Sequence, residues 1–180
     1  MAVTYIALIG ADRDKEIESL LIKRLSTRYC IIKTDKHQVV QVGQGYDVVL
    51  YASDSVREIT LDSVIVILKK DCSYCPKILS KNSTIIAFAE NEKQISALSK
   101  ITQPVITCSG QKSTISFSSN SDEGAVITLN RRIKSLSSRV IEPLEFPIYV
   151  ENGYSLYSFM ALTATQLMLD DFNSKLGKLF

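Results

Sequence analysis

The chain has 180 residues, of which 46% are hydrophobic, and its 21 basic and 19 acidic residues leave a net charge of +2. A chain of this length and apolar content can bury a complete core, so we expect a single domain over residues 1–180. The balanced charge excludes a globally basic nucleic-acid-binding protein, and no stretch is apolar over the length of a membrane span, so we expect neither nucleic-acid binding nor membrane insertion.

The N-terminus and the cysteines indicate the cell compartment. The sequence starts with a strand-like run instead of a basic segment and an apolar signal stretch, which predicts a cytoplasmic protein. Four scattered cysteines are too few for a disulfide framework, and a reducing compartment keeps them as thiols. Cys30 and Cys108 lie in apolar runs and are predicted to be small core residues.

The chain begins with a predicted strand, a polar loop and a helix. Residues 4–9 are an apolar run, residues 10–14 read Gly-Ala-Asp-Arg-Asp, and apolar side chains then follow at helical spacing as far as Leu25. This pattern is typical of the opening of an α/β domain, where a nucleotide phosphate normally lies on the helix N-terminus.

The loop itself lacks the groups that grip a phosphate. A phosphate-binding loop needs several glycines and a Lys followed by Ser or Thr, and Gly10 is its only glycine. Arg13 stands where a second glycine is needed, and Asp12 and Asp14 would face the anion with like charge. We therefore predict that the loop from Gly10 to Lys15 is vestigial and that the protein has no cofactor.

The next part of the chain predicts a mostly parallel sheet flanked by helices, over about residues 1–110. Strand-like runs occupy residues 29–32, 39–42, 47–51, 63–68, 84–88 and 104–108. Residues 63–68 show no polar alternation, so we expect a central parallel strand with helices on both faces. The intervening segments predict a short helix over residues 76–79 and a helix over residues 92–100, which Glu90 and Asn91 cap and whose Ile95 and Leu98 face inward.

A small antiparallel part is predicted over about residues 111–152. Residues 114–118 and 125–129 alternate in polarity around a turn at 120–124, with Ile115 and Phe117 on one face. Residues 145–150 predict a third strand, which Pro147 limits to an edge. Gly153 then turns the chain into a helix over residues 155–169, within a segment of about 154–170 that we expect to pack between sheets.

This order of elements resembles the central, ATP-binding domain of the Mur ligases, the amide synthetases of peptidoglycan synthesis. Residues 6–21 resemble the family's strand, G-T-N-G-K-T loop and helix, and Gly10 matches the first glycine of that loop. Residues 83–92 resemble the strand that ends in an Asn and acidic residues, and residues 105–110 resemble the strand before the small sheet. Residues 153–161 resemble the G-x-H-N-x-x-N-x-x-A-A helix start. The resemblance implies a P-loop-type α/β fold.

The chemical groups of the family are not matched. Asp14, or Lys15 after a slip of one residue, stands where the phosphate-binding Lys is expected, and Tyr154 and Ser155 stand near the family's His and Asn. Positioning and electrostatics supply nearly all of the catalysis in phosphoryl transfer, so a ligase without these groups has no route to an acyl phosphate.

The magnesium ligands of the family are not matched either. Asp54 or Glu58 fits the position of the acidic ligand, but the only histidine, His37, lies elsewhere. We therefore predict no metal and no catalytic residues. The prediction is a non-catalytic domain that contacts an unknown protein partner and is linked to cell-envelope synthesis.

A competing motif is Cys72-Ser73-Tyr74-Cys75-Pro76, which follows a predicted strand and resembles a thioredoxin or glutaredoxin active site. In that alternative the protein is a thiol-disulfide oxidoreductase, with Cys72 as nucleophile and Cys75 as resolving thiol. Lys69 and Lys70 would lower a thiol pKa, and Pro104 resembles the proline beside such dithiols. The short helix expected after Cys75 favours ordinary loop cysteines instead.

Four other features have both a functional and a structural interpretation. His37 is expected in a solvated loop rather than in a site. A basic cluster of Arg131, Arg132, Lys134 and Arg139 fits an acidic partner or phosphate, but also a solvated face. A carboxylate group of Asp54, Glu58 and Asp62 fits a residual ligand site, but also loop solubility. Three aromatic side chains fit core packing better than a cofactor stack; they are Tyr154, Tyr157 and Phe159.

Overall fold

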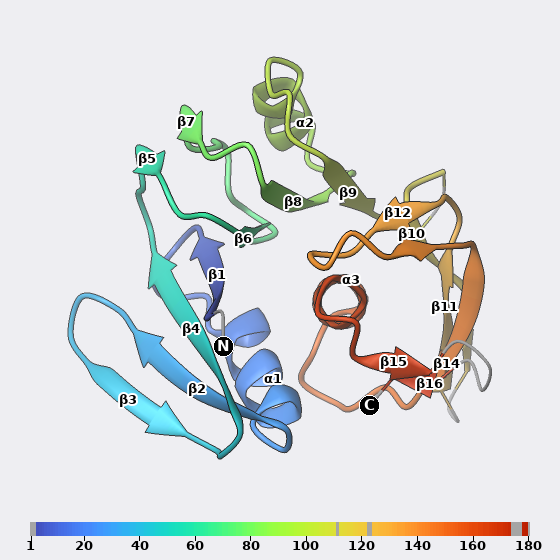
Figure 1. Ribbon diagram of the computed structural model, residues 1–180. Coiled ribbons are helices and arrows are strands. Elements are labelled where there is room, and N and C mark those ends of the chain that lie inside the picture. Colours follow the sequence, from blue (N-terminus) through green and yellow to red (C-terminus); the bar gives the residue numbers. More distant parts are fainter. Residues whose placement is uncertain (1–2, 111, 122–123, 174–177, 180) are drawn as a thin grey trace.

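The computed structural model describes residues 3–110, 112–121, 124–173 and 178–179, and these residues form a ten-stranded sheet with three helices (Figure 1). The strands of the sheet, in spatial order, are β14 (Leu144–Ile148), β11 (Gly124–Leu129), β10 (Ile115–Ser121), β9 (Val105–Cys108), β8 (Ser83–Phe88), β6 (Val64–Leu68), β1 (Thr4–Ile9), β4 (Tyr46–Ser53), β2 (Tyr29–Thr34) and β3 (Val39–Val42). Neighbours from β10 to β2 are parallel, whereas β3, β11 and β14 pair antiparallel. The predicted fold class is confirmed.

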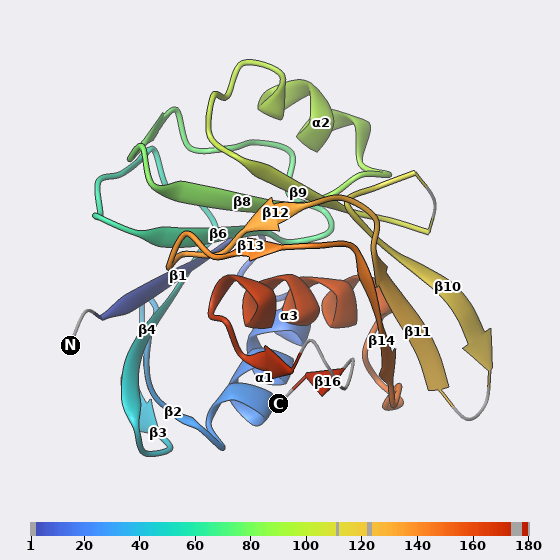
Figure 2. The same ribbon diagram turned by 45° about the vertical axis from the view of Figure 1, so that its right-hand side comes forward.

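Helices cover both faces of the central strands. The helices α1 (Glu16–Leu25) and α3 (Leu156–Met168) lie on one face, and α2 (Glu92–Leu98) lies on the other (Figures 1 and 2). Strand β6 divides its side chains between two cores, because Ile65 and Ile67 belong to the core with α1 and α3 and the alternate residues belong to the core with α2. All five residues of β6 are fully buried, as the unbroken apolar run predicted.

The prediction of a helix over residues 76–79 is wrong. Strand β7 (Ile78–Leu79) lies there instead and pairs in parallel with β5 (Glu58–Ile59). The backbone N–H of Lys77 donates to Arg57 O at 3.0 Å, so the groups that a helix would bond internally are used across the two segments. Four residues are also too few to offset the cost of starting a helix.

Helix α2 begins where it was predicted but turns a different side chain inward. The Asn91 side chain accepts hydrogen bonds from two N–H groups of the first turn and caps the helix. Ile95 is 38% exposed, contrary to prediction, and Gln94 is fully buried in its place. The Gln94 amide accepts from Phe88 N at 3.0 Å and donates to Lys69 O at 2.7 Å, which accounts for its burial.

The antiparallel strands continue the main sheet and wrap around α3 (Figure 2). They join it through one pair of residues, Ile115 of β10 opposite Cys108 of β9. Pro147 lies in β14, the outermost strand, as predicted. Every residue from Tyr157 to Met168 of α3 is buried because the sheet and α1 surround the helix. The predicted turn at 120–124 lies partly outside the described residues.

Three short pairs of strands complete the structure that the described residues form. Besides β5 and β7, these strands are β12 (Ile133–Lys134) with β13 (Val140–Ile141), and β15 (Phe172–Asn173) with β16 (Lys178–Leu179). None of the helices in this part of the chain is long and apolar enough to cross a membrane.

Candidate functional site

The loop between β1 and α1 lies at the carboxyl edge of the parallel strands, where open α/β sheets bind ligands. Gly10 begins this loop with a φ of +140°, a conformation that favours glycine. A Cβ atom on Gly10 would lie 2.8 Å from Lys69 Cβ, which is closer than two carbons can approach. Gly10 therefore serves the close approach of the Lys69 side chain.

The Lys69 side chain is buried inside the loop and binds its carbonyl groups. It follows β6 directly and is 1% exposed, and its Nζ donates to Ala11 O at 2.9 Å and to Asp14 O at 2.6 Å. Its own backbone is fixed, since Lys69 N donates to Ile9 O at 2.8 Å. Burial lowers the pKa of Lys69, and the negative charge of Asp14 acts in the opposite direction. The loop thus surrounds an internal cation with its carbonyl groups.

Several N–H groups of the loop are already bonded within the protein. Gly10 N donates to Ser53 O at 3.0 Å, and Asp14 N donates to Ala11 O at 3.1 Å. The first N–H of α1, that of Glu16, donates to Asp14 Oδ1 at 3.1 Å. A phosphate cradle needs such N–H groups to converge on the anion. Here an internal carboxylate lies at the N-terminus of α1 instead.

Glu16 joins the start of α1 to the start of α3. Its Oε1 accepts hydrogen bonds from Ser155 N and, at 2.7 Å, from Ser158 Oγ. Burial acts to raise the pKa of Glu16, but the bonds from these two serines outweigh it and lower the pKa. Ser155 also caps α3, and Tyr154 packs edge-on against Phe159 with ring centres 6.1 Å apart. The positions matched to the family's His and Asn therefore pack and cap a helix.

The carboxylates predicted for a residual ligand site do not gather. Asp54 lies at the carboxyl edge of the sheet, where Lys36 Nζ is 2.7 Å from Asp54 Oδ2 and 3.2 Å from Asp12 Oδ2. The bond from Lys36 lowers the pKa of Asp54. Glu58 lies in β5, and Asp62 precedes β6 at the opposite edge of the sheet. In the described part of the chain, no three His, Cys, Asp or Glu residues form a group that could hold a metal ion.

The Cys72 and Cys75 pair lacks the setting of a reactive dithiol. The element directly after Cys75 is the strand β7 and not a helix, and both cysteines are free. Burial raises the pKa of Cys72, although the charge of Lys69 opposes it, and burial raises the pKa of Cys75 to about 11. Pro104 precedes β9 and so lies at the opposite edge of the sheet from Cys72, which follows β6.

The remaining predicted features have structural roles. His37 is exposed in the connection between β2 and β3, as predicted. Tyr157 is buried, and its hydroxyl donates to Leu68 O at 2.5 Å. The centre of its ring lies 4.9 Å from the centre of the Phe88 ring. These contacts agree with core packing.

The basic cluster is exposed and partly paired. Arg132 Nη2 lies 2.9 Å from Glu142 Oε1, and the guanidinium of Arg139 lies 4.9 Å from the centre of the Phe172 ring. Arg131 and Lys134 are also exposed. This arrangement agrees with a solvated face.

Two lysines at the carboxyl edge of the sheet, Lys69 and Lys36, were not predicted as parts of the site. The sequence pattern indicated a role for Lys69 only as a neighbour of the cysteine pair, and it indicated none for Lys36. A signal for Lys69 is present in the sequence, because this lysine directly follows the unbroken apolar run of residues 64–68. A lysine at the end of such a strand needs an internal hydrogen-bond acceptor if its side chain stays in the protein.

No protein-family model and no curated protein sequence matches this chain. Solved structures of similar fold include the MurF ligase from Thermotoga maritima in complex with ADP, with a TM-score of 0.56 and 10% sequence identity, over 98% of this chain and 48% of that one. A MurF structure from Acinetobacter baumannii has a TM-score of 0.57 and 7% identity, over 93% of this chain and 43% of that one. This chain therefore spans about half the length of these ligases or less, and at such identities the likeness shows a Mur-ligase-like fold.

Proposed function

We propose that this chain is a non-catalytic, Mur-ligase-like domain that does not bind nucleotide and acts through a protein partner in cell-envelope synthesis. The observation that carries the proposal is the Lys69 ammonium, bonded to the carbonyls of Ala11 and Asp14 inside the loop. The link to envelope synthesis rests on the likeness of the fold to that of MurF ligases.

A phosphate cannot enter this loop without breaking its internal bonds. A hydrogen bond to a charged group contributes roughly 1.5–3 kcal/mol, so freeing the ammonium from both carbonyls costs about 3–6 kcal/mol before any phosphate contact forms. Carbonyl oxygens left facing a phosphate would repel it. The residues present therefore do not fit a triphosphate.

Magnesium meets a similar obstacle. The carboxylates of Asp12, in the loop, and Asp54, at the end of β4, already share the ammonium of Lys36, and the Asp14 carboxylate accepts from Glu16 N. A divalent cation would have to displace Lys36 from these carboxylates. The carbonyls of Ala11 and Asp14 already accept hydrogen bonds from the Lys69 ammonium. With neither the nucleotide nor its metal, phosphoryl transfer has no chemical basis in this chain. A role through contact with a partner is the function that remains.

Calorimetric titration tests the loss of nucleotide binding. ATP or ADP with Mg²⁺ is titrated into the wild-type chain, and the proposal expects no saturable heat at micromolar affinity. If heat is released, Arg13→Ala in the loop is compared with Lys81→Ala, an exposed cation that precedes β8 at the opposite edge of the sheet. Micromolar binding that Arg13→Ala abolishes and Lys81→Ala preserves would overturn the proposal.

A further inference from the structure

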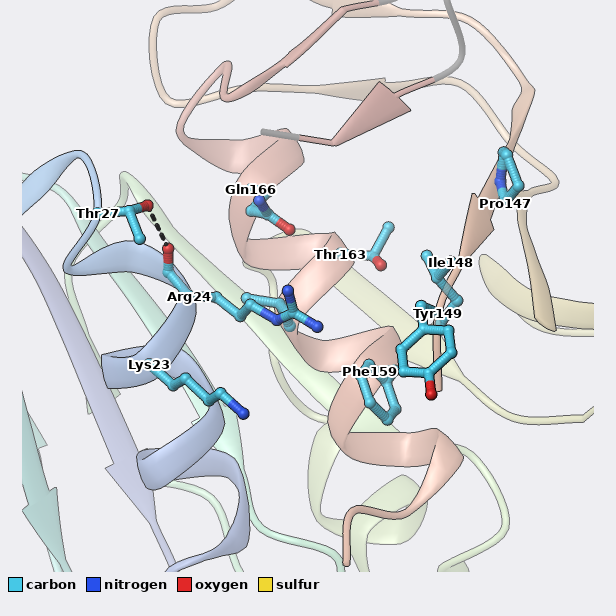
Figure 3. Close-up of a pocket in the computed structure, with 10 residues that line it drawn as sticks. Lys23, Arg24, Thr27, Pro147, Ile148, Tyr149, Phe159, Thr163 and Gln166 are labelled. Carbon is cyan, nitrogen blue, oxygen red and sulfur yellow. Dashed lines mark hydrogen bonds between the residues drawn. The ribbon is translucent and has the colours of Figure 1, made fainter. Parts of the chain in front are cut away.

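A cavity of about 460 Å³ lies between α1, α3 and β14, away from the loop (Figure 3). Phe159, Leu162 and Thr163 of α3 contribute to its lining. Figure 3 shows Lys23 and Arg24 on the α1 side, and Pro147, Ile148 and Tyr149 on the opposite side. Its volume lies within the range of about 300–1,000 Å³ that ligand sites occupy. This cavity is called the α1–α3 groove below.

One wall of the α1–α3 groove is positively charged and already holds a carboxylate. Glu151 Oε1 lies 2.5 Å from Arg24 Nη2, and Glu151 Oε2 pairs with Lys23 Nζ. The bond from Lys23 lowers the pKa of Glu151, so this carboxyl group is ionised at neutral pH. Two cations share one carboxylate, and both keep exposed surface, because the side chains of Lys23 and Arg24 are 55% and 40% exposed.

The opposite wall is the outermost strand of the sheet. Strand β14 pairs with β11 on one side, and on its other side no strand of the described chain pairs with it in the sheet. Tyr149, just after this strand, is 70% exposed beside the groove. A strand edge that is unpaired in the sheet, with apolar side chains around it, is a surface to which an extended peptide can add, except at Pro147, which has no N–H to donate.

We propose that the α1–α3 groove binds an extended peptide segment of a partner protein, in which an Asp or Glu precedes an apolar residue. The acidic side chain would bind Lys23 and Arg24 in place of Glu151, and the apolar side chain would pack against Phe159 and Leu162. Thr163 adds a polar group to the lining, which suits the amides of a peptide better than an alkyl chain. This proposal rests on the partner role proposed above and names the chemistry of that partner.

The test is an NMR titration of the full chain with a library of short, capped peptides. Each peptide carries one central glutamate followed by a different apolar residue, and a matched library carries glutamine in place of glutamate. We expect glutamate peptides to shift the amide signals of α1, α3 and β14 at millimolar concentration or below. Lys23→Ala or Arg24→Ala should each weaken binding about tenfold, and Glu151→Gln should strengthen it about threefold.

Two controls make the test specific. Lys81→Ala removes an exposed lysine outside the groove and should leave binding unchanged. Tyr149→Ala should weaken binding without unfolding the chain, since that side chain is largely exposed. The proposal is overturned if no peptide binds, if glutamine peptides bind equally, or if Lys23→Ala and Arg24→Ala have no effect. It is also overturned if the same amide signals shift with decanoate, titrated in the same way, or with rising concentration of the chain itself, but not with the glutamate peptides. The nucleotide titration is a separate measurement, so its failure is distinguishable from failure here.

Discussion

The Nζ atom of Lys69 donates a hydrogen bond of 2.6 Å to the main-chain carbonyl of Asp14. The two residues are 55 positions apart, and their contact ties the end of β6 to the loop before α1. Because the same ammonium also bonds Ala11 O, one buried side chain holds the loop from inside. The stability of this edge of the sheet should therefore depend on Lys69 and on the residue that makes room for it.

Replacing Gly10 by alanine should destabilise the protein by about 3 kcal/mol. Its positive φ alone costs about 1–3 kcal/mol for a residue with a side chain, and the contact with Lys69 Cβ adds overpacking of about 1–3 kcal/mol. Urea unfolding measures the loss. Gly153→Ala is the control, since Gly153 has a φ of +93° but no atom within 4 Å of an added Cβ. Equal losses in the two variants would show that Lys69 does not crowd Gly10.

Removing the charge of Lys69 should be costly although no ligand is involved. Lys69→Met keeps most of the side-chain volume but removes the donor to Asp14 O, at about 1–3 kcal/mol for that unsatisfied group, and one of the two donors to Ala11 O, which keeps its bond from Asp14 N. Lys70→Met changes the adjacent, exposed lysine and should cost less than about 1 kcal/mol. The free energies of unfolding of both variants are compared. A Lys69→Met variant as stable as the wild type would contradict the described contacts.

The sequence predicted the parts of the fold that depend on local pattern. An unbroken apolar run indicated that β6 is buried on both faces, and apolar residues on several faces indicated the buried helix α3. The errors arose where a distant partner decides the structure. Residues 76–79 form a strand because β5 supplies hydrogen bonds, and Gln94 displaces Ile95 from the interior because it meets Lys69 O and Phe88 N.

The sequence shows which groups of a phosphate-binding loop are absent. The missing glycines and the acidic residues of the loop are visible in it, and the absence of a bound phosphate stays a prediction that rests on them. The sequence did not reveal which side chain binds the carbonyl groups of the loop. Lys69 reaches the loop because parallel pairing places the end of β6 beside the end of β1. Such a register depends on the whole sheet and cannot be read from one segment.

Acid should weaken the connection between β2 and β3. The N–H of His37 donates to Asp35 Oδ1 at 2.8 Å and, with smaller contributions from Gln38 and Lys33, lowers the pKa of Asp35 from 3.8 to about 2. Because the pKa is lower in the folded state, this stabilisation is complete above pH 3.8 and is lost as the pH falls towards 2.

A comparison with one variant isolates that titration. The difference in free energy of unfolding between wild type and Asp35→Ala should shrink as the pH falls through this window. Chemical denaturation at a series of pH values gives this difference. If the Asp35→Ala difference grows with acid, the assigned direction of the pKa shift is wrong.

Cys72 and Cys75 should react slowly with iodoacetamide at neutral pH. Burial raises the pKa of both thiols, to about 11 for Cys75, and the thiolate is the reactive form. Mass spectrometry of the alkylated peptides measures each rate against that of free glutathione. Alkylation of Cys72 faster than glutathione, together with insulin reduction that Cys72→Ser abolishes, would instead support an oxidoreductase.

A crystal structure of the chain soaked with Mg²⁺ and a non-hydrolysable ATP analogue tests the central claim most directly. The account predicts that Lys69 Nζ stays bonded to the carbonyls of Ala11 and Asp14 and that no nucleotide lies against residues 10–15. A triphosphate seated on that loop, with the Lys69 side chain displaced from it, would contradict the account.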